Sequence, residues 1–195
     1  MLVRMSVVLR RPMTLDEFLA WEDRQELRWE FDGFDPVAMT GGTLAHEMIG
    51  GNILIAVQTR LAGRRCRAFG ANLKIEVAGR IRYPDAFVFC TTLPPKTTVV
   101  RDPVVVFEVL SESTSRIDRI AKLREYGATP SIQRYVILEQ DAIAAMVFVR
   151  KGTDLVAEAL TAADTLRMPE IGVDVPMGEF YTGVELTADP DEPAS

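Results

Sequence analysis

Two segments in the first third of the chain carry the capping residues and the apolar spacing of helices. Thr14 and Glu17 form a capping box, which predicts a short helix that ends at about residue 23. Thr43 precedes the longer segment 44–61, in which apolar residues recur on one helical face. These apolar residues are Met48, Ile49, Ile53, Leu54, Val57 and Leu61. The pattern therefore predicts two helices, each preceded by a threonine N-cap.

Most of the remaining apolar segments are short and are typical of β-strands. The strand segments are residues 27–31, 36–39, 66–77, 81–90, 104–110, 134–138, 143–149 and 155–160, with a further short strand and one helical turn within 169–181. Asp32-Gly33 is a hairpin signal between the first two strands. Ala78-Gly79 predicts a second turn, which makes the strands on either side of it antiparallel. Gly70 interrupts the first of those two strands.

The order of elements between residues 43 and 138 defines the fold class. It runs helix, three strands, helix and strand, and the second helix extends from Asp118 to about Tyr126. That helix carries the chain to a strand that can lie parallel to the strand it left. We therefore predict an α/β fold in which helices flank a mixed β-sheet, with additional strands after residue 138.

The length and composition fit one globular domain. A chain of 195 residues can bury a full hydrophobic core, and its 48% hydrophobic and 26% charged residues are ordinary for a soluble protein. We expect the domain to span residues 13–183, after an N-terminal segment, 1–12. An acidic tail, 184–195, follows it.

The net charge of −6 counts against a broad, non-specific nucleic-acid surface, because such surfaces are normally basic. It does not exclude a local basic patch, and Arg60, Arg64, Arg65 and Arg67 form such a cluster around a turn. We expect nucleic acid to contact Arg60, Arg64 and Arg65.

The cysteines and the lengths of the apolar runs indicate in which cellular compartment we expect the protein. Cys66 and Cys90 are too few and too far apart in the sequence for a disulfide framework or a cysteine-based metal site. No apolar run approaches the ~20 residues that span a bilayer. The N-terminal segment, which Arg4 interrupts, does not have the pattern of a signal peptide. We therefore expect a reduced, cytoplasmic setting without a membrane partner.

Two acids are set into apolar strand segments, Asp85 in 81–90 and Glu108 in 104–110. A buried charge is costly unless it is paired or bound to a metal, so two such acids on neighbouring strands indicate a divalent-cation site. Pro84 removes a backbone donor beside Asp85 and could open space there for a ligand. The alternative is that Glu108 pairs with an arginine or lies in water at the end of its strand.

Several short motifs of the chain resemble one protein family. They are Thr14-Leu15-Asp16-Glu17-Phe18, Arg28-Trp29-Glu30 with Asp32-Gly33, Ala45-His46, Arg82-Tyr83-Pro84-Asp85, Val106-Phe107-Glu108-Val109-Leu110-Ser111, and Asp118-Arg119-Ile120-Ala121-Lys122 with Tyr126. Together, over about residues 13–181, they resemble the Uma-type putative restriction endonucleases of the PD-(D/E)XK nuclease superfamily. The resemblance implies a restriction-endonuclease-like core with metal-binding acids on its second and third strands.

These acids correspond to Asp85 and Glu108, and the carbonyl of Val109 is a third expected ligand for Mg²⁺ or Mn²⁺. The superfamily pattern also places a lysine two positions after the second acid, but this chain has Leu110 there. A cation is needed near the transition-state charge, so another lysine must supply it. The chain has four lysines, of which Lys122 and Lys74 are the candidates.

Lys122 follows Asp118 by one helical turn, and both side chains therefore point either at the site or at solvent. We favour Lys122 because its family-like motif places it one turn into a helix that starts soon after the third strand. A two-residue turn at Ala78-Gly79 would pair Lys74 with Tyr83, on the same face as Asp85, but a one-residue slip would reverse that face. Each lysine could equally be a solvated surface residue.

The resemblance also suggests that the acid Glu30 faces the site. His46, the only histidine, is an accessory candidate, although a lone histidine at a helix start more often caps or packs. Ser111 and Ser113 precede a helix and could donate to a phosphate, or they could simply belong to an N-cap segment.

These observations predict a metal-dependent endonuclease that hydrolyses phosphodiester bonds in DNA. The alternative is a protein that shares the nuclease fold and binds without cleaving, because fold alone does not establish function. We also expect a homodimer, since the strands 143–160 carry an apolar series at what would be an exposed sheet edge.

Overall fold

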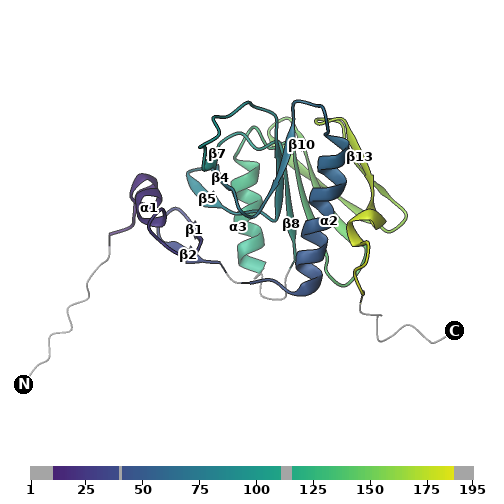
Figure 1. Ribbon diagram of the computed structural model, residues 1–195, viewed down its shortest axis with the longest axis horizontal. Helices are drawn as coiled ribbons and strands as arrows, with labels where there is room; N and C mark the ends of the chain where they lie inside the picture. Colours follow the sequence, from purple (N-terminus) through teal and green to yellow (C-terminus); the bar gives the residue numbers. More distant parts are fainter. Residues whose placement is uncertain (1–10, 40, 111–115, 187–195) are drawn as a thin grey trace, which may run out of the picture.

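The computed structural model describes residues 11–39, 41–110 and 116–186 (Figure 1). The helices are α1 (Leu15–Glu22), α2 (Leu44–Arg60), α3 (Arg116–Gly127) and the 3-10 helix η1 (Met177–Tyr181). The strands are β1 (Trp29–Phe31), β2 (Pro36–Ala38), β3 (Arg67–Gly70), β4 (Lys74–Val77), β5 (Arg80–Arg82), β6 (Ala86–Phe89), β7 (Val99–Val100), β8 (Val105–Val109), β9 (Arg134–Leu138), β10 (Ala144–Lys151), β11 (Asp154–Thr161), β12 (Thr165–Met168) and β13 (Val173–Pro176). The predicted helices are confirmed, whereas β7 and β12 are strands that the pattern did not predict.

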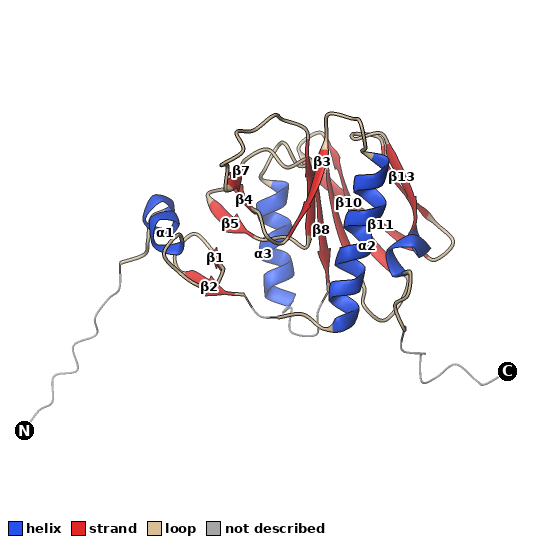
Figure 2. Cartoon of the chain, in the orientation of Figure 1, coloured by secondary structure: helices blue, strands red, loops and turns tan. Residues whose placement is uncertain are grey.

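A six-stranded sheet in the order β11-β10-β9-β8-β6-β3 forms the centre of the molecule. Strands β8 and β9 are parallel, and every other neighbouring pair in this sheet is antiparallel. Helix α3 connects the two parallel strands, as the sequence predicts (Figure 2). The mixed sheet with helices on its faces confirms the predicted α/β class.

The two strands predicted around the Ala78-Gly79 turn are each divided between two sheets. Their halves nearer the turn, β4 and β5, pair in a second sheet with the order β2-β1-β5-β4-β7, whereas β3 and β6 belong to the central sheet. Antiparallel pairing is confirmed in each half, but the halves do not share one sheet. The chain changes sheets just after Gly70 and around Pro84, because these residue types interrupt a strand. As a result, Asp85 lies at the break between the sheets.

The central sheet is buried on both faces. One face packs against α2, η1 and the β12–β13 hairpin. The predicted apolar face of α2 is confirmed there, since Ile49, Ile53 and Val57 are fully buried. The other face packs against α3 together with β4 and β7 of the second sheet. Helices α2 and α3 therefore approach the same strands from opposite sides.

Helix α1 and the β1–β2 hairpin form a small N-terminal layer, set apart from α2 in Figure 2. The capping box of α1 is confirmed: Thr14 accepts from the Glu17 N–H while the Glu17 carboxylate accepts from the Thr14 N–H. Phe18 and Phe31 stack with their ring centroids 4.9 Å apart. The layer joins the second sheet where Phe31 pairs with Ile81.

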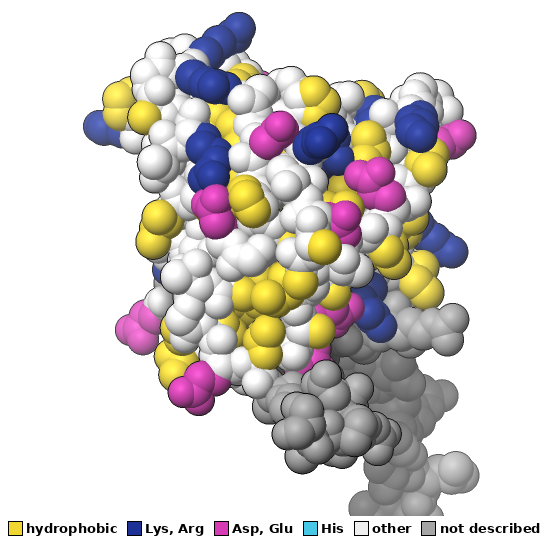
Figure 3. Space-filling view, turned by 90° about the vertical axis from the view of Figure 1, so that its right-hand side faces the viewer, with side chains coloured by type: hydrophobic (Ala, Val, Ile, Leu, Met, Phe, Trp, Pro, Cys, Tyr) yellow, Lys and Arg dark blue, Asp and Glu magenta, His cyan; other side chains and the backbone are white. Residues whose placement is uncertain are grey.

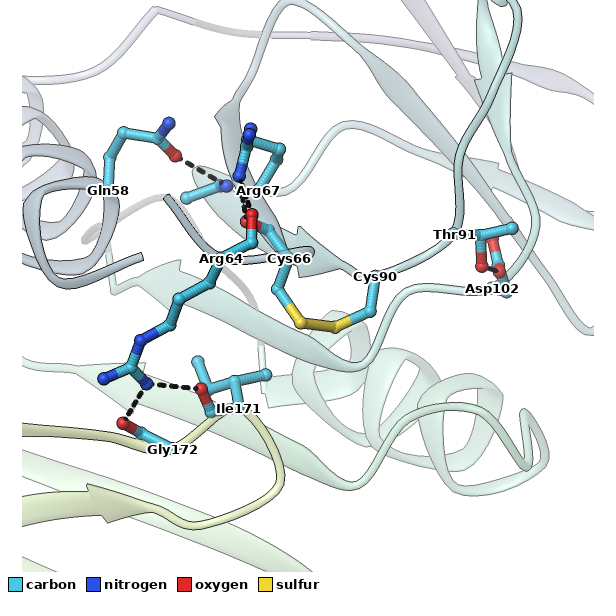
Figure 4. Close-up of a disulfide and its surroundings, with 10 residues drawn as sticks. Gln58, Arg64, Cys66, Arg67, Cys90, Thr91, Asp102, Ile171 and Gly172 are labelled. Atoms are coloured by element: carbon cyan, nitrogen blue, oxygen red, sulfur yellow. Dashed lines mark hydrogen bonds between the residues drawn. A yellow bond between two sulfur atoms is a disulfide. The ribbon is translucent and has the colours of Figure 1, made fainter. Parts of the chain in front are cut away.

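Cys66 and Cys90 form a disulfide, which corrects the expectation that they lie too far apart (Figure 4). Each cysteine is next to a residue of the Arg67–Phe89 pair in the antiparallel register of β3 and β6. Pairing of the strands thus brings residues separated by 24 positions to a Cα–Cα distance of 3.9 Å. The cysteines consequently no longer support the expectation of a reduced, cytoplasmic setting.

Strand β11 forms one edge of the central sheet, and most of its residues are exposed. Figure 3 faces this side of the molecule, where hydrophobic side chains gather among charges of both signs. None of the helices in the described ranges is long and apolar enough to cross a membrane.

Candidate active site

Asp85 stands just before β6, where the chain enters the central sheet. Its Oδ2 atom accepts a hydrogen bond of 2.7 Å from the N–H of Val109, at the end of the neighbouring strand β8. The side chain is only 16% exposed. The bend at Pro84 therefore brings the Asp85 carboxylate to the residue that follows Glu108.

Glu108 points from β8 toward α3. Its carboxylate accepts hydrogen bonds from the Lys122 ammonium at 3.0 Å and from the Tyr126 hydroxyl at 2.8 Å. Burial raises the pKa of Glu108 to about 7, although Lys122 opposes this shift, and the carboxylates of Asp85 and Glu30 raise it further. The alternative that Glu108 pairs with an arginine is therefore wrong: its partners are a lysine and a tyrosine.

Lys122 reaches the strand from α3 and is 13% exposed. Burial opposes its charged form, but the carboxylates of Glu108, Glu30 and Asp118 outweigh burial and raise its pKa. The Asp118 carboxylate lies 3.9 Å from the ammonium, so helical spacing places both residues on the face that meets Glu108. The structure thus places an ammonium beside the second acid although the expected lysine position holds Leu110.

His46 lies one turn into α2, where the N-cap Thr43 accepts a hydrogen bond from the His46 N–H. Its Nε2 atom is 3.3 Å from Asp85 Oδ2. This hydrogen bond with Asp85 is the main cause of a raised pKa of His46, and burial opposes it. His46 thus both lies at the helix start and contacts the first acid.

Glu30 accepts hydrogen bonds from the Arg82 guanidinium at 2.9 Å and from the Tyr83 N–H at 3.0 Å. Arg82 also makes two hydrogen bonds of 2.7 Å to Glu125 on α3. Glu30 is near enough to the site to raise the pKa values of Glu108 and Lys122. The N-terminal layer is thereby tied to the helix that carries Lys122.

Three further residues of this network, Arg82, Glu125 and Tyr126, were not predicted as site residues from the sequence. Two signals were present: Arg82 begins the motif that contains Asp85, and Tyr126 follows Lys122 by four positions on the same helical face. Glu125 gave no comparable signal, because it lies on α3 and its buried partner, Arg82, comes from β5 of the second sheet, 43 positions earlier in the chain.

A groove of about 530 Å³ opens beside Asp85 and His46. Its lining contains five glycines, Gly41, Gly42, Gly50, Gly51 and Gly70. A Cβ added at Gly50 or Gly51 would meet nothing within 4 Å, whereas one at Gly70 would lie 2.9 Å from Leu54 Cδ1. Where these glycines line the groove, no side chain projects into it, so a ligand can approach the backbone next to Asp85.

Lys74 lies outside this site, which corrects its assignment as a candidate site cation. The expected register is present, because Ile75 pairs with Arg82, but the strand bends before Asp85. Lys74 is buried in a salt bridge with Glu22 of α1, and Glu22 also accepts a 2.6 Å hydrogen bond from the Tyr83 hydroxyl. Lys74 therefore joins the N-terminal layer to the second sheet.

Two of the expected nucleic-acid contacts, Arg60 and Arg64, also have structural partners. Arg60 lies 2.7 Å from the Glu179 carboxylate, and Arg64 donates to the carbonyls of Ile171 and Gly172. Arg60 ends α2, about 20 Å along the helix from His46, given a rise of 1.5 Å per residue, and Arg64 lies just beyond the helix. Arg65 is exposed. Ser111 and Ser113 lie outside the described residues.

The oxygen atoms of Asp85, Glu108 and Val109 are the hard donors that Mg²⁺ or Mn²⁺ prefers. Within the described part of the chain, no cluster of three or more Asp, Glu, His or Cys side chains could hold a metal ion. Two carboxylates suffice for Mg²⁺, which usually retains several waters. Burial is the main cause of the raised pKa of Glu108, and the nearby carboxylates of Asp85 and Glu30 add to it. A cation would offset the charge of these acids, so the donor set fits such an ion.

Comparisons with known proteins agree with this fold. The model of the Uma2 family, described as "Putative restriction endonuclease", matches residues 15–176. Two uncharacterised proteins of Synechocystis are similar in sequence: slr1290 is 29% identical over 87% of this chain and 91% of its own, and sll1609 is 24% identical over 70% and 80%.

A crystal structure described as a putative nuclease of family DUF820 from Anabaena variabilis superposes with a TM-score of 0.73. The match covers 88% of this chain and 98% of that one at 17% sequence identity, so it supports the fold alone.

Proposed function

Since the chain belongs to the Uma2 family of putative restriction endonucleases, we propose that it is a metal-dependent nuclease that hydrolyses phosphodiester bonds in DNA. The observation that carries this proposal is the 3.0 Å contact between Lys122 and Glu108, next to Asp85. Lys122, on α3, supplies the ammonium group that the superfamily pattern places at the position of Leu110. Two acids and one lysine then lie close together, and one of the acids, Asp85, lines the groove.

The residues divide the chemistry between them. Asp85, Glu108 and the Val109 carbonyl would hold Mg²⁺ or Mn²⁺, which when bound lowers the pKa of a water and offsets phosphate charge. Lys122 places a positive charge where the phosphate becomes more negative in the transition state. His46 and the Val109 N–H orient the Asp85 carboxylate through hydrogen bonds. Glu30 contributes negative charge that keeps Lys122 protonated.

Cleavage of plasmid and single-stranded DNA, with and without Mn²⁺, tests the proposal. We expect Asp85→Asn, Glu108→Gln and Lys122→Met each to slow cleavage by about 100-fold or more, as loss of one charge-stabilising group typically does. Asp174→Asn, an exposed acid on β13, is the matched control and should cleave at the wild-type rate.

Circular dichroism would show whether each variant is folded. Cleavage by folded Asp85→Asn at the wild-type rate would contradict the assignment of the site. If Lys122→Met is the one variant that cleaves at the wild-type rate, Lys122 has no role in catalysis, whereas the assignment of the two acids stands.

A second candidate function is a nuclease-fold protein that binds DNA or a partner without cleaving it. It is favoured by one observation: Glu108 and Asp85 already have hydrogen-bond donors in Lys122, Tyr126 and the Val109 N–H. Calorimetric titration with Mn²⁺ separates the two functions. A nuclease should bind Mn²⁺ and lose that binding in Glu108→Gln, whereas the binding protein should show no Mn²⁺ binding in either form.

A further inference from the structure

A second hollow, of about 370 Å³, lies along the outer strand β3 and the loop that follows β6. Its base is aromatic. Phe69, on β3, is 39% exposed although it is a large apolar residue. Its ring stacks on Phe89 with centroids 5.4 Å apart and lies 6.3 Å from Phe87. Phe87 and Phe89 are buried, so they hold the exposed ring in a fixed orientation.

The rim of this hollow is basic. Arg65 and Arg67 line it, and Lys96 belongs to the same loop as the lining residues Pro95 and Thr97. All three cations are exposed, and within the described residues none of them has a carboxylate partner.

Arg67 donates to the carbonyls of Arg64 and Cys66, which holds it at the rim (Figure 4). The nearby acid is Asp102, to which the lining residue Thr91 is hydrogen-bonded. An aromatic base with a positive rim complements a ligand that has a flat ring and an anionic backbone.

This hollow adjoins the groove of the candidate active site. Phe69 and Leu73 line the hollow, whereas the residues between them, 70–72, line the groove beside Asp85. A Cβ at Gly70 would lie 3.4 Å from the backbone oxygen of Asp85. Successive side chains of a strand point to opposite faces, so Phe69 lies on the face with Phe87 and Phe89, whereas Gly70 faces Leu54 of α2. Because β3 is the edge strand of the central sheet, one flexible polymer chain can reach both hollows by passing over that edge.

We propose that this hollow is a stacking subsite for an unpaired nucleobase, so that single-stranded DNA passes over the edge strand β3, with one base on Phe69 and its backbone in the Asp85 groove on the other face. The subsite rests on the proposed nuclease function and specifies its substrate class. Bases of an intact duplex are stacked on each other and cannot reach a ring at a sheet edge, whereas a single strand exposes them. Arg65, Arg67 and Lys96 contact the phosphates on either side of that base.

Fluorescence anisotropy with a labelled single-stranded oligonucleotide, in EDTA so that no cleavage occurs, tests the subsite. Phe69→Ala should weaken binding by about tenfold, the usual effect of losing one base–aromatic stack. Phe69→Trp should retain binding and show fluorescence quenching beyond that of the wild-type tryptophans. The matched control is Phe34→Ala, since Phe34 is 58% exposed in the β1–β2 turn, away from both hollows. It should bind as tightly as wild type.

Several outcomes would overturn the proposal. Equal binding by wild type and Phe69→Ala, with no quenching in Phe69→Trp, would do so. So would a change in oligomeric mass for Phe69→Ala without a change in DNA binding, which would make Phe69 a contact between copies. If wild type cleaves DNA in Mn²⁺ while Phe69→Ala binds normally, only the subsite fails. If wild type neither binds nor cleaves DNA, the nuclease function fails as well.

Discussion

At the scale of single residues, two of the lysines are buried against a glutamate, and their surroundings differ. Lys122 and Glu108 lie close to Asp85, which lines the groove, and further carboxylates raise the pKa values of both. Lys74 and Glu22 are 5% and 7% exposed; Glu22 also accepts from the Tyr83 hydroxyl, and Lys74 lies 3.7 Å from the Asp23 carboxylate. The first pair is placed to meet a ligand, whereas the second holds α1 on the second sheet.

Lys74→Met should therefore reduce stability rather than catalysis. Removing one partner of a buried ion pair leaves the other charge uncompensated, which typically costs about 3–5 kcal/mol. Urea denaturation would measure the loss. The double variant Lys74→Met/Glu22→Gln should recover part of it, because the stranded charge is gone. If Lys74→Met keeps wild-type stability but loses cleavage, Lys74 acts in catalysis and our placement of it is wrong.

At the scale of elements, β11 leaves one edge of the central sheet unpaired in the described chain. Strand β11 pairs with β10 along one of its sides, from the Ala144–Thr161 pair to the Lys151–Asp154 pair. Val156 on β11 is 42% exposed, and Met146 on β10 is 40% exposed. Such an edge can pair with another strand, and a second copy of the chain is the occupant that we propose.

Light scattering at micromolar concentration should accordingly give twice the chain mass of 21.7 kDa. Val156→Lys should shift the protein toward monomer, since a charged edge residue discourages strand pairing. Leu27→Lys, which changes a 71% exposed leucine in the N-terminal layer, is the matched control and should leave the mass unchanged. A strict monomer for wild type would rule out the dimer.

At the scale of the whole molecule, the Cys66–Cys90 disulfide ties the start of β3 to the end of β6 and closes a loop that contains β4 and β5 of the second sheet. The loop carries Lys74, Arg82 and Asp85, so it links the N-terminal layer to the candidate site. Cross-linking restricts the unfolded chain more than the folded one.

The double variant Cys66→Ser/Cys90→Ser should consequently be less stable by about 3.5 kcal/mol, the value expected for a loop of this length. Urea denaturation of the oxidised protein, compared with that variant, measures the difference. Wild type in excess reductant should match the variant. Identical midpoints for oxidised wild type and the variant would mean that the disulfide contributes no stability.

The sequence by itself determined the local elements and the identity of the acids. Capping residues and apolar spacing predicted α1 and α2, and the element order predicted the parallel β8–β9 pair. Asp85 and Glu108 stood out because charges are rare inside strand patterns. These features depend on neighbours a few positions apart, which a single sequence displays directly.

Only the tertiary structure decided which distant residues meet. The bend at Pro84 separated Lys74 from Asp85, and the packing of α3 on β8 brought Lys122 to Glu108. The antiparallel register of β3 and β6 joined Cys66 to Cys90 across 24 positions. Side-chain contacts between elements depend on how sheets bend and on which face each helix covers. That information resides in the packing of the whole core rather than in any local pattern.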